Sequence, residues 1–170
     1  MTAAPALKLM AFDVDGVLTD GALYYTEEGR EFKAFNTLDG LGLKLLQQSG
    51  VKLAIITGRK SGCVQHRAKN LGIHLLYQGV EDKRQVMAAL LEEQGLTFAE
   101  AGYMGDDVVD LPVMRACGFS AAPANAHPLV KQHASYTSLA SGGYGAVREV
   151  CEHLLQASGQ LDQILTAYLQ

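Results

Sequence analysis

The stretch LMAFDVDGVLTD at residues 9–20 decides the fold, because an apolar strand runs directly into two aspartates that one residue separates. Asp13 ends the strand, and Gly16 allows a sharp turn that brings Asp13 and Asp15 to one point. Asp also favours ordinary strand-to-loop turns. The motifs further along the chain make a functional pair the stronger interpretation.

Outward from this stretch, short apolar runs alternate with amphipathic segments of helical length. The pattern predicts strands at residues 9–14, 53–57, 74–77, 102–105 and 119–121, and helices at residues 41–48, 63–71, 83–94, 107–116, 147–156 and 161–168. Such alternation indicates a mostly parallel sheet with helices on both faces. We therefore predict an α/β fold, a Rossmann-like three-layer sandwich formed by a single domain over residues 1–170 with a C-terminal tail at about 142–170. Residues 22–26 and 31–35 flank the turn EEGR and predict a projecting β-hairpin at about 22–35.

The composition narrows the class of protein. The 170 residues are 48% hydrophobic and carry a net charge of −4 with no run of Lys and Arg, which argues against a nucleic-acid partner. No apolar run reaches the length of a membrane span and no signal peptide is evident. Three widely spaced cysteines predict neither a metal site nor a disulfide framework. We expect a cytoplasmic protein with no membrane partner.

Six of the nine aspartates fall into two short stretches, which are Asp13, Asp15 and Asp20, and then Asp106, Asp107 and Asp110. Carboxylates that are brought together repel one another unless a cation neutralises them. An all-oxygen site with few protein ligands suits Mg²⁺. We predict Asp13, Asp15 and Asp106 as metal ligands, and Asp107 and Asp110 as residues that act behind them or cap the following helix.

The same positions suit phosphoryl transfer. Asp13 can attack phosphorus to form an aspartyl-phosphate, and Asp15 can serve as general acid and then as base for water. The hydroxyl and the free amides after the second strand, at Thr57, can donate to a phosphoryl oxygen. Lys83 can neutralise the transferring group. A Thr in a strand and a Lys at a helix start also have ordinary structural interpretations.

These segments, in this order, resemble the haloacid dehalogenase-like hydrolase superfamily. The matching residues are the pair Asp13 and Asp15, then Thr57, then Lys83, and finally Asp106 with Asp107. The resemblance implies a Rossmann-like fold, Mg²⁺ and an aspartyl-phosphate intermediate. Only 41 residues separate Asp15 from Thr57, and 22 separate Lys83 from Asp106, so no cap domain fits in either gap.

Further stretches are DVDGVLTDG at 13–21, ITGRK at 56–60, AHPL at 126–129 and GGYGAVREVC at 142–151. With them the chain resembles a capless, homotetrameric subgroup, and this resemblance implies action on an eight-carbon acidic sugar phosphate in lipopolysaccharide synthesis. In that subgroup, hairpins and a glycine-rich tail such as GGYGAVREVC at 142–151 pack around neighbouring active sites. The resemblance implies substrate contacts from Asp15 and Lys83 and from the positions Asn36, Thr37, Leu38, Asp39, Gly40, Lys44, Arg59 and Arg67. Lys44 and Arg67 are equally interpretable as exposed helix cations.

Three alternatives remain open at this point. A phosphatase of a nine-carbon acidic sugar phosphate would need the same motifs. A phospho-acceptor signalling module would also use an Asp and Mg²⁺, but Asp15 argues against it. A non-catalytic oligomerisation module would be expected to lack at least one motif residue, and none is lacking.

Overall fold

A parallel sheet forms the centre of the computed structural model, which describes residues 7–170. Its six strands are β1 Leu9–Phe12, β4 Lys52–Ile56, β5 Leu75–Tyr77, β6 Ala101–Met104, β7 Phe119–Ala122 and β8 Tyr136–Thr137. They lie in the order β5-β4-β1-β6-β7-β8, and every neighbouring pair is parallel. Ala11 of β1 lies opposite Ala54 of β4 and Tyr103 of β6. The carboxyl ends of β4, β1 and β6 therefore meet at one edge of the sheet.

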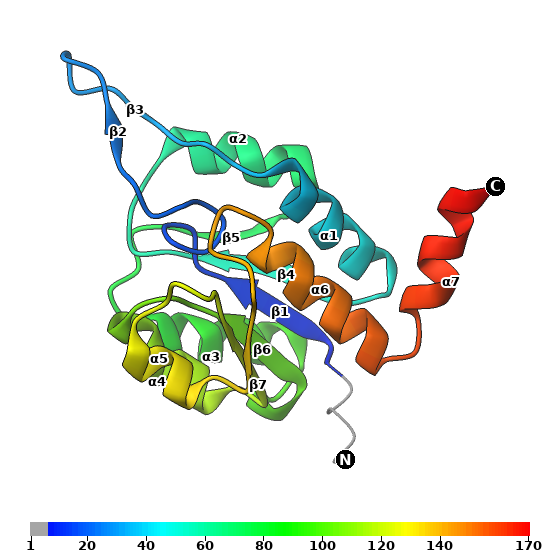
Figure 1. Cartoon of the computed structure of the whole chain (residues 1–170). Helices are drawn as coiled ribbons and strands as arrows, with labels where there is room; N and C mark the ends of the chain where they lie inside the picture. The colour runs from blue at the N-terminus through cyan, green and yellow to red at the C-terminus, as the bar shows by residue number, and fades with distance from the viewer. Residues whose placement is uncertain (1–6) are drawn as a thin grey trace.

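Helices cover both faces of the sheet, as predicted (Figure 1). Their bounds are α1 Thr37–Gln48, α2 Gly62–Leu71, α3 Lys83–Gln94, α4 Leu111–Ala116, α5 Pro128–His133, α6 Ala146–Ala157 and α7 Leu161–Thr166. Helices α1, α2 and α6 lie on one face, and α3, α4 and α5 lie on the other. None of these helices combines the length and the apolar character that a bilayer span requires. The α/β three-layer sandwich is confirmed.

Side-chain alternation along β1 supplies both halves of the core. Met10 and Phe12 pack in the cluster beneath α1, α2 and α6, while Leu9 and Ala11 pack in the cluster beneath α3, α4 and α5. All four side chains are fully buried. A strand that is apolar on both faces is what a covered parallel sheet requires, because successive side chains point to opposite faces.

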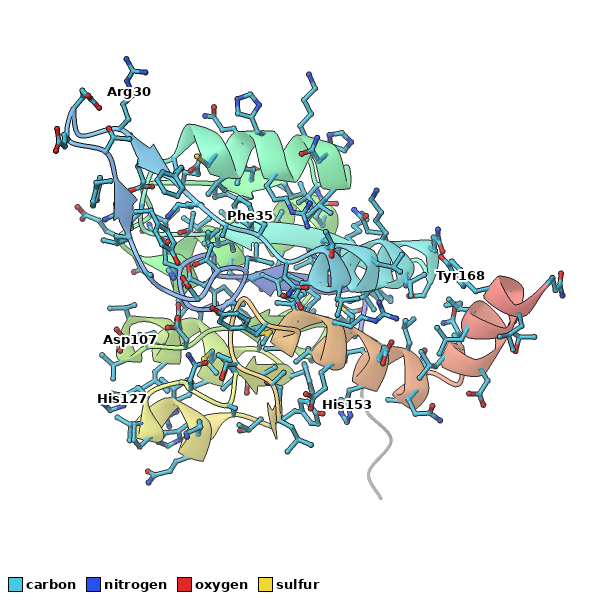
Figure 2. The ribbon with its side chains drawn as sticks, turned by 45° about the horizontal axis from the view of Figure 1, so that its top comes forward. Arg30, Phe35, Asp107, His127, His153 and Tyr168 are labelled. Atoms are coloured by element: carbon cyan, nitrogen blue, oxygen red, sulfur yellow. The ribbon has the colours of Figure 1, made fainter. Side chains whose placement is uncertain are left out.

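The predicted hairpin is confirmed, although its strands are short. β2 Tyr24–Tyr25 pairs antiparallel with β3 Glu31–Phe32, and the rings of Tyr24 and Phe32 stack with their centroids 5.2 Å apart. The hairpin projects from the sheet, with Arg30 near its tip (Figure 2). No further domain covers the strand ends in the described residues, in agreement with the predicted absence of a cap.

Local chemistry explains where element boundaries differ from the prediction. α1 begins at Thr37 instead of residue 41, because the Asn36 side chain caps it by accepting hydrogen bonds from the amides of Leu38 and Asp39. The helix predicted at 107–116 begins as a 3₁₀ turn at Val108–Asp110, and α4 starts only at Leu111. The last predicted helix ends at Thr166 and continues as a 3₁₀ turn at Ala167–Leu169. α5 and β8 were not predicted, since six and two residues are too short for a periodic pattern.

Candidate active site

Three polar residues follow the three central strands at the carboxyl edge of the sheet. Asp13 comes directly after β1, Thr57 directly after β4, and Asp106 two residues after β6. Ligands of open parallel sheets bind at this edge. Neighbouring strands thus bring together residues that lie far apart in the sequence.

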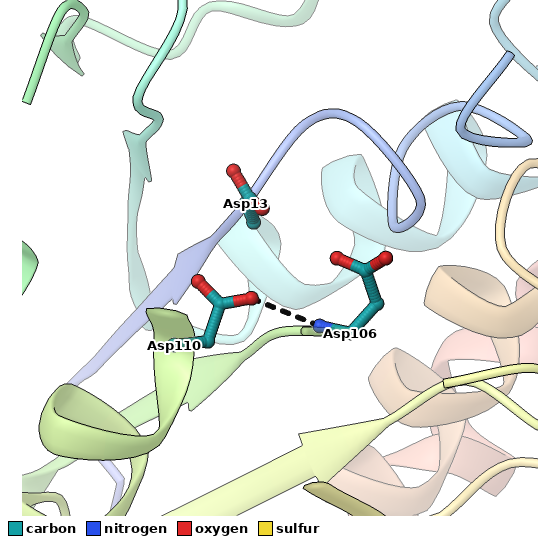
Figure 3. Close-up of side chains that lie close together, drawn as sticks. All are labelled: Asp13, Asp106 and Asp110. Atoms are coloured by element: carbon teal, nitrogen blue, oxygen red, sulfur yellow. Dashed lines mark hydrogen bonds between the residues drawn. The ribbon is translucent and has the colours of Figure 1, made fainter. Parts of the chain in front are cut away.

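The carboxyl groups of Asp13, Asp106 and Asp110 converge at this edge (Figure 3). One oxygen atom of each lies within 4.8 Å of the others. Burial raises the pKa of Asp13 to about 6, with a further contribution from the charge of Asp110. Burial likewise raises the pKa of Asp106 to about 7, helped by the charge of Asp13. Burial and mutual repulsion therefore disfavour the charged forms of the Asp13 and Asp106 carboxylates when no cation is bound.

This donor set fits Mg²⁺. The ion prefers oxygen ligands, is usually bound through one or two carboxylates, and keeps several waters. Asp13 and Asp106 supply two carboxylates beside an open cleft, and a divalent cation between them would remove the repulsion that raises their pKa values.

Asp110 differs from the other two carboxylates, because protein donors already occupy both of its oxygens. Oδ2 accepts hydrogen bonds from the amides of Asp106 at 3.0 Å and Asp107 at 3.2 Å. Oδ1 accepts from Lys83 Nζ at 2.6 Å and from the hydroxyl of Tyr103 at 3.3 Å. The side chain is fully buried. Asp110 therefore holds the Asp106 loop in place and supports the candidate metal ligands Asp13 and Asp106 from the protein interior.

Lys83 links the acidic residues at the start of α3. Its Nζ lies 3.1 Å from Asp13 Oδ1 as well as 2.6 Å from Asp110 Oδ1, and the side chain is almost fully buried. Burial by itself lowers the pKa of Lys83, but the charges of Asp13 and Asp110 outweigh it and raise the pKa. The ammonium group is therefore a fixed positive charge next to Asp13.

A cleft of about 390 Å³ opens over this cluster. All four predicted catalytic residues line it, namely Asp13, Asp15, Thr57 and Lys83, together with the predicted site residues Arg59, Asp106 and Asp107. The amide of Thr57 donates to the carbonyl of Tyr77 at 3.0 Å and is not free, so a donor to phosphate at this position has to be the hydroxyl. A hollow of about 480 Å³ at the C-terminal ends of α1 and α6 is larger, but no carboxylate lines it.

Asp15 lies in the cleft, yet its carboxylate is not part of the three-carboxylate group. Oδ1 pairs with Lys33 Nζ at 2.5 Å, and Oδ2 lies 3.8 Å from Arg59 Nε. A metal-ligand role for Asp15 stays a prediction. The loop closes tightly here because Gly16 has φ +87°, and a Cβ at Gly16 would lie 2.0 Å from Asp106 Oδ2.

The remaining predicted substrate contacts lie elsewhere. Thr37, Gly40, Lys44 and Arg67 line a separate hollow of about 200 Å³, which shares no residue with the catalytic cleft. Leu38 is 59% exposed at the start of α1.

Asn36 and Asp39 have clear structural tasks in this region. Asn36 caps α1, and the buried Asp39 accepts a hydrogen bond from the amide of Arg148 at 2.8 Å. Burial raises the pKa of Asp39. A single chain therefore does not bring this group together with Asp13.

Sequence reasoning missed two residues of the site. Tyr103 of β6 was not predicted as a site residue, but its hydroxyl donates to the carbonyl of Ile56 at 2.9 Å and lies 3.3 Å from Asp110 Oδ1. Lys33 follows the hairpin and was not singled out, although it is the direct partner of Asp15. The sequence offers only weak signals for these two residues. For Tyr103 the signal is the side-chain alternation along β6, and for Lys33 it is the close spacing of charged residues around the hairpin.

The chain matches known proteins over most of its length. The haloacid dehalogenase-like hydrolase family model, Hydrolase_3, matches residues 77–147. The 3-deoxy-D-manno-octulosonate 8-phosphate phosphatase KdsC of Salmonella typhi is 47% identical over 163 residues, which cover 96% of this chain and 87% of that protein.

Solved structures of similar proteins point to the same family. A probable YrbI-family phosphatase from Pseudomonas syringae superposes with a TM-score of 0.96 at 52% identity, covering 98% of this chain and 95% of the other. The 3-deoxy-D-manno-octulosonate 8-phosphate phosphatase of Moraxella catarrhalis, crystallised with magnesium, phosphate and a KDO molecule, superposes with a TM-score of 0.95 at 44% identity, covering 97% and 95%. With its aspartates, Thr57 and Lys83 all in place at the carboxyl edge of the sheet, the chain belongs to the 3-deoxy-D-manno-octulosonate 8-phosphate phosphatases of the haloacid dehalogenase-like hydrolase family.

Proposed function

We propose that this chain hydrolyses 3-deoxy-D-manno-octulosonate 8-phosphate to the free sugar acid and phosphate, for lipopolysaccharide biosynthesis. The chain is a phosphoric monoester hydrolase by family. The observation that carries the proposal is the position of Asp13, which lies at the tip of β1, beside the fixed charge of Lys83 and in an open cleft that also contains Asp15.

Asp13 and Asp15 divide the chemistry between them. A carboxylate oxygen of Asp13 attacks phosphorus, the bond from phosphorus to the sugar oxygen breaks, and Asp15 delivers a proton to that oxygen. Asp15 then takes a proton from water as the water oxygen attacks phosphorus. The bond between phosphorus and Asp13 breaks, which releases phosphate and restores the free carboxylate.

Positive charge and hydrogen-bond donors stabilise the transferring group. Mg²⁺, held by Asp13 and Asp106, would neutralise charge on the phosphoryl oxygens. Lys83 places its ammonium group beside the attacking carboxylate, and Thr57, whose hydroxyl can donate to a phosphoryl oxygen, lines the same cleft. Preorganised charge of this kind is usually the largest single contribution to phosphoryl transfer.

Recognition of the sugar acid needs cations beyond Lys83. Arg59 lines the catalytic cleft and is 43% exposed, so the substrate carboxylate can reach it although it also pairs with Glu31. We propose that Asn36–Gly40, Lys44 and Arg67 contribute from a neighbouring subunit of a homotetramer.

Two features support this assembly. The separate hollow is cationic through Lys44 and Arg67. The hairpin exposes about half of the side chains of Tyr25 and Phe32, although a two-stranded hairpin is marginally stable alone and needs a covering surface. The three free cysteines fit a reducing compartment, and we propose that the enzyme acts in the cytoplasm.

The test is phosphate release from a panel of sugar phosphates at equal concentration. We expect 3-deoxy-D-manno-octulosonate 8-phosphate to give the highest kcat/KM, with neutral hexose phosphates far behind because they lack the carboxylate. A nine-carbon acidic sugar 9-phosphate is the critical competitor, and preferential turnover of it would contradict the proposed substrate. Failure to release phosphate from any of them would contradict the proposed reaction.

A further inference from the structure

Lys33, which follows the hairpin strand β3, directly contacts Asp15, the residue proposed to transfer the proton. Its Nζ lies 2.5 Å from Asp15 Oδ1, although the two residues are 18 positions apart in the sequence. Lys33 directly follows β3, at the base of the hairpin, and only 2% of its side chain is exposed. A lysine that is so well covered is held by its carboxylate partners, because leaving its charge unpaired would be costly.

Two more residues close a ring of alternating charges around Asp15. Lys33 Nζ lies 3.3 Å from Glu31 Oε1, and Glu31 Oε2 lies 2.5 Å from Arg59 Nη2. Arg59 Nε in turn lies 3.8 Å from Asp15 Oδ2. Both oxygens of Asp15 therefore face a cation of the ring, and two of the four members come from the hairpin strand β3 or the residue after it.

The two cations of the ring differ in access. Arg59 is 43% exposed and lines the catalytic cleft, so substrate can reach it. Lys33 is covered, and its ammonium already lies between Asp15 and Glu31. The geometry suits Lys33 for holding a neighbouring group and leaves it poorly placed to bind substrate itself.

We propose that Lys33 is a positioning residue for Asp15, which it holds in the orientation that delivers a proton to the sugar oxygen. This inference rests on the proposed function, since it needs a leaving group that requires protonation. Small displacements of a catalytic group cost ~10²-fold in rate. A lysine in the hairpin would thereby couple the placement of the hairpin to proton transfer in the cleft.

The substitution Lys33→Met tests this through the dependence on the leaving group. A sugar alkoxide must be protonated as it leaves, whereas p-nitrophenolate leaves without a proton. We expect kcat/KM for the sugar phosphate to fall ~10- to 100-fold while kcat/KM for p-nitrophenyl phosphate changes by less than about 3-fold, because kcat/KM reports the step that forms the aspartyl-phosphate. Lys33→Arg should restore most of the sugar phosphatase activity.

A double-mutant cycle supplies the second readout. In an Asp15→Asn background, Lys33→Met should cause no further loss, because residues that act as a unit are not additive. Lys52→Met is the matched control and should leave both activities unchanged. Lys52 is exposed and pairs with Gln94 at the opposite edge of the sheet.

The possible outcomes separate this inference from the proposed function. Equal loss with both phosphates, additive losses in the cycle, or wild-type activity of Lys33→Met would each overturn the positioning role. Should Lys33→Met not fold, Glu31→Gln opens the ring and should show the same selective loss, and an equal loss with both phosphates would again overturn the proposal. A wild-type chain that hydrolyses neither phosphate would contradict the function itself.

Discussion

Acidic residues of one type take different roles in this site according to the contacts that each already makes. Asp110 accepts hydrogen bonds from four donors on its two oxygens and is fully buried, so its role is structural. Asp13 has one ion pair with Lys83 and faces the cleft, so an oxygen is left to react. Asp15 meets cations through both oxygens. Residue identity alone would not distinguish these three carboxylates.

Asp13→Asn removes the nucleophile while keeping the size of the side chain. We expect phosphate release to fall by ~10³-fold or more, because a neutral amide does not form the acyl-phosphate. The exposed Asp162→Asn on α7 is the control and should keep full activity. Substantial turnover by folded Asp13→Asn would remove the covalent mechanism.

Proton and metal binding should compete at Asp13 and Asp106. Their pKa values of about 6 and about 7 lie above the ordinary 3.8, so between about pH 4 and pH 7 the folded protein binds more protons than the unfolded chain. The free energy of unfolding of the chelated protein therefore falls as the pH rises through this window. We expect its melting temperature to be lower at about pH 8 than at about pH 5.5.

Adding Mg²⁺ should reverse that loss. The ion should raise the melting temperature more at the higher pH, where it no longer displaces protons, and chelation should abolish phosphate release reversibly. Calorimetry at both pH values with and without Mg²⁺ checks this. Equal stabilisation at the two pH values would contradict a site built on Asp13 and Asp106.

The sequence predicted the residues of this site better than their contacts. Asp13, Thr57, Lys83 and Asp106 could be found because each lies within two residues of a strand end or begins a helix, which is visible as a local pattern. The partnership of Lys33 with Asp15 could not, since it depends on how the hairpin folds back over 18 residues.

At the scale of elements, the alternation of apolar runs with amphipathic segments identified the strands, whereas side-chain caps set where the helical segments begin. The apolar runs predicted five of the six strands of the sheet, because a strand covered on both faces needs them. The start of α1 at Thr37 depended on the Asn36 cap, and the 3₁₀ turn at Val108–Asp110, which precedes α4, depended on the Asp107 cap. Side-chain acceptors in loops leave no periodic signal.

Tyr103 joins three elements and gives the test at this scale. Its hydroxyl, on β6, donates to the carbonyl of Ile56 at the end of β4 and lies 3.3 Å from Asp110 Oδ1. Tyr103→Phe should lower the free energy of unfolding by about 1–3 kcal/mol, because it leaves a buried carbonyl unpaired. We also expect a modest loss of activity.

Urea unfolding measures the change. Tyr168→Phe is the matched control, since Tyr168 is 60% exposed near the C-terminus and should tolerate the change without effect. Equal stability of the two variants would contradict the linking role of Tyr103.

At the scale of the whole molecule, the predicted substrate contacts fall into two separate hollows. One contains the chemistry of Asp13 and the other the cations Lys44 and Arg67. Sequence order gave no sign of this separation, because Asn36–Gly40 lies between the first two motifs along the chain. Packing of α1 against α6 through the buried Asp39 places the segment away from the cleft. We propose that the two sets meet only in the assembly of several chains.

Phe32→Glu tests the proposed assembly. Phe32 is 53% exposed on the hairpin, and a charge there should disfavour burial against a neighbouring subunit. We expect light scattering to show smaller species and phosphate release to fall at least ~10-fold, because the cleft would lose its outer wall. Leu169→Glu, at an 84% exposed apolar position, is the control. An active tetramer of Phe32→Glu would contradict the role of the hairpin.

The glycine-rich segment before α6 has a consequence for how the enzyme matures. Gly142 lies against the loop after β1 so closely that a Cβ would be 1.9 Å from the carbonyl oxygen of Gly16, and the amide of Gly143 donates to the carbonyl of Val17. The loop that carries Asp15 is synthesised more than 120 residues before this supporting segment. A chain still emerging from the ribosome therefore carries every catalytic side chain before it has the backbone that holds the Asp15 loop in place, and the site can be complete only after the glycine-rich segment has emerged.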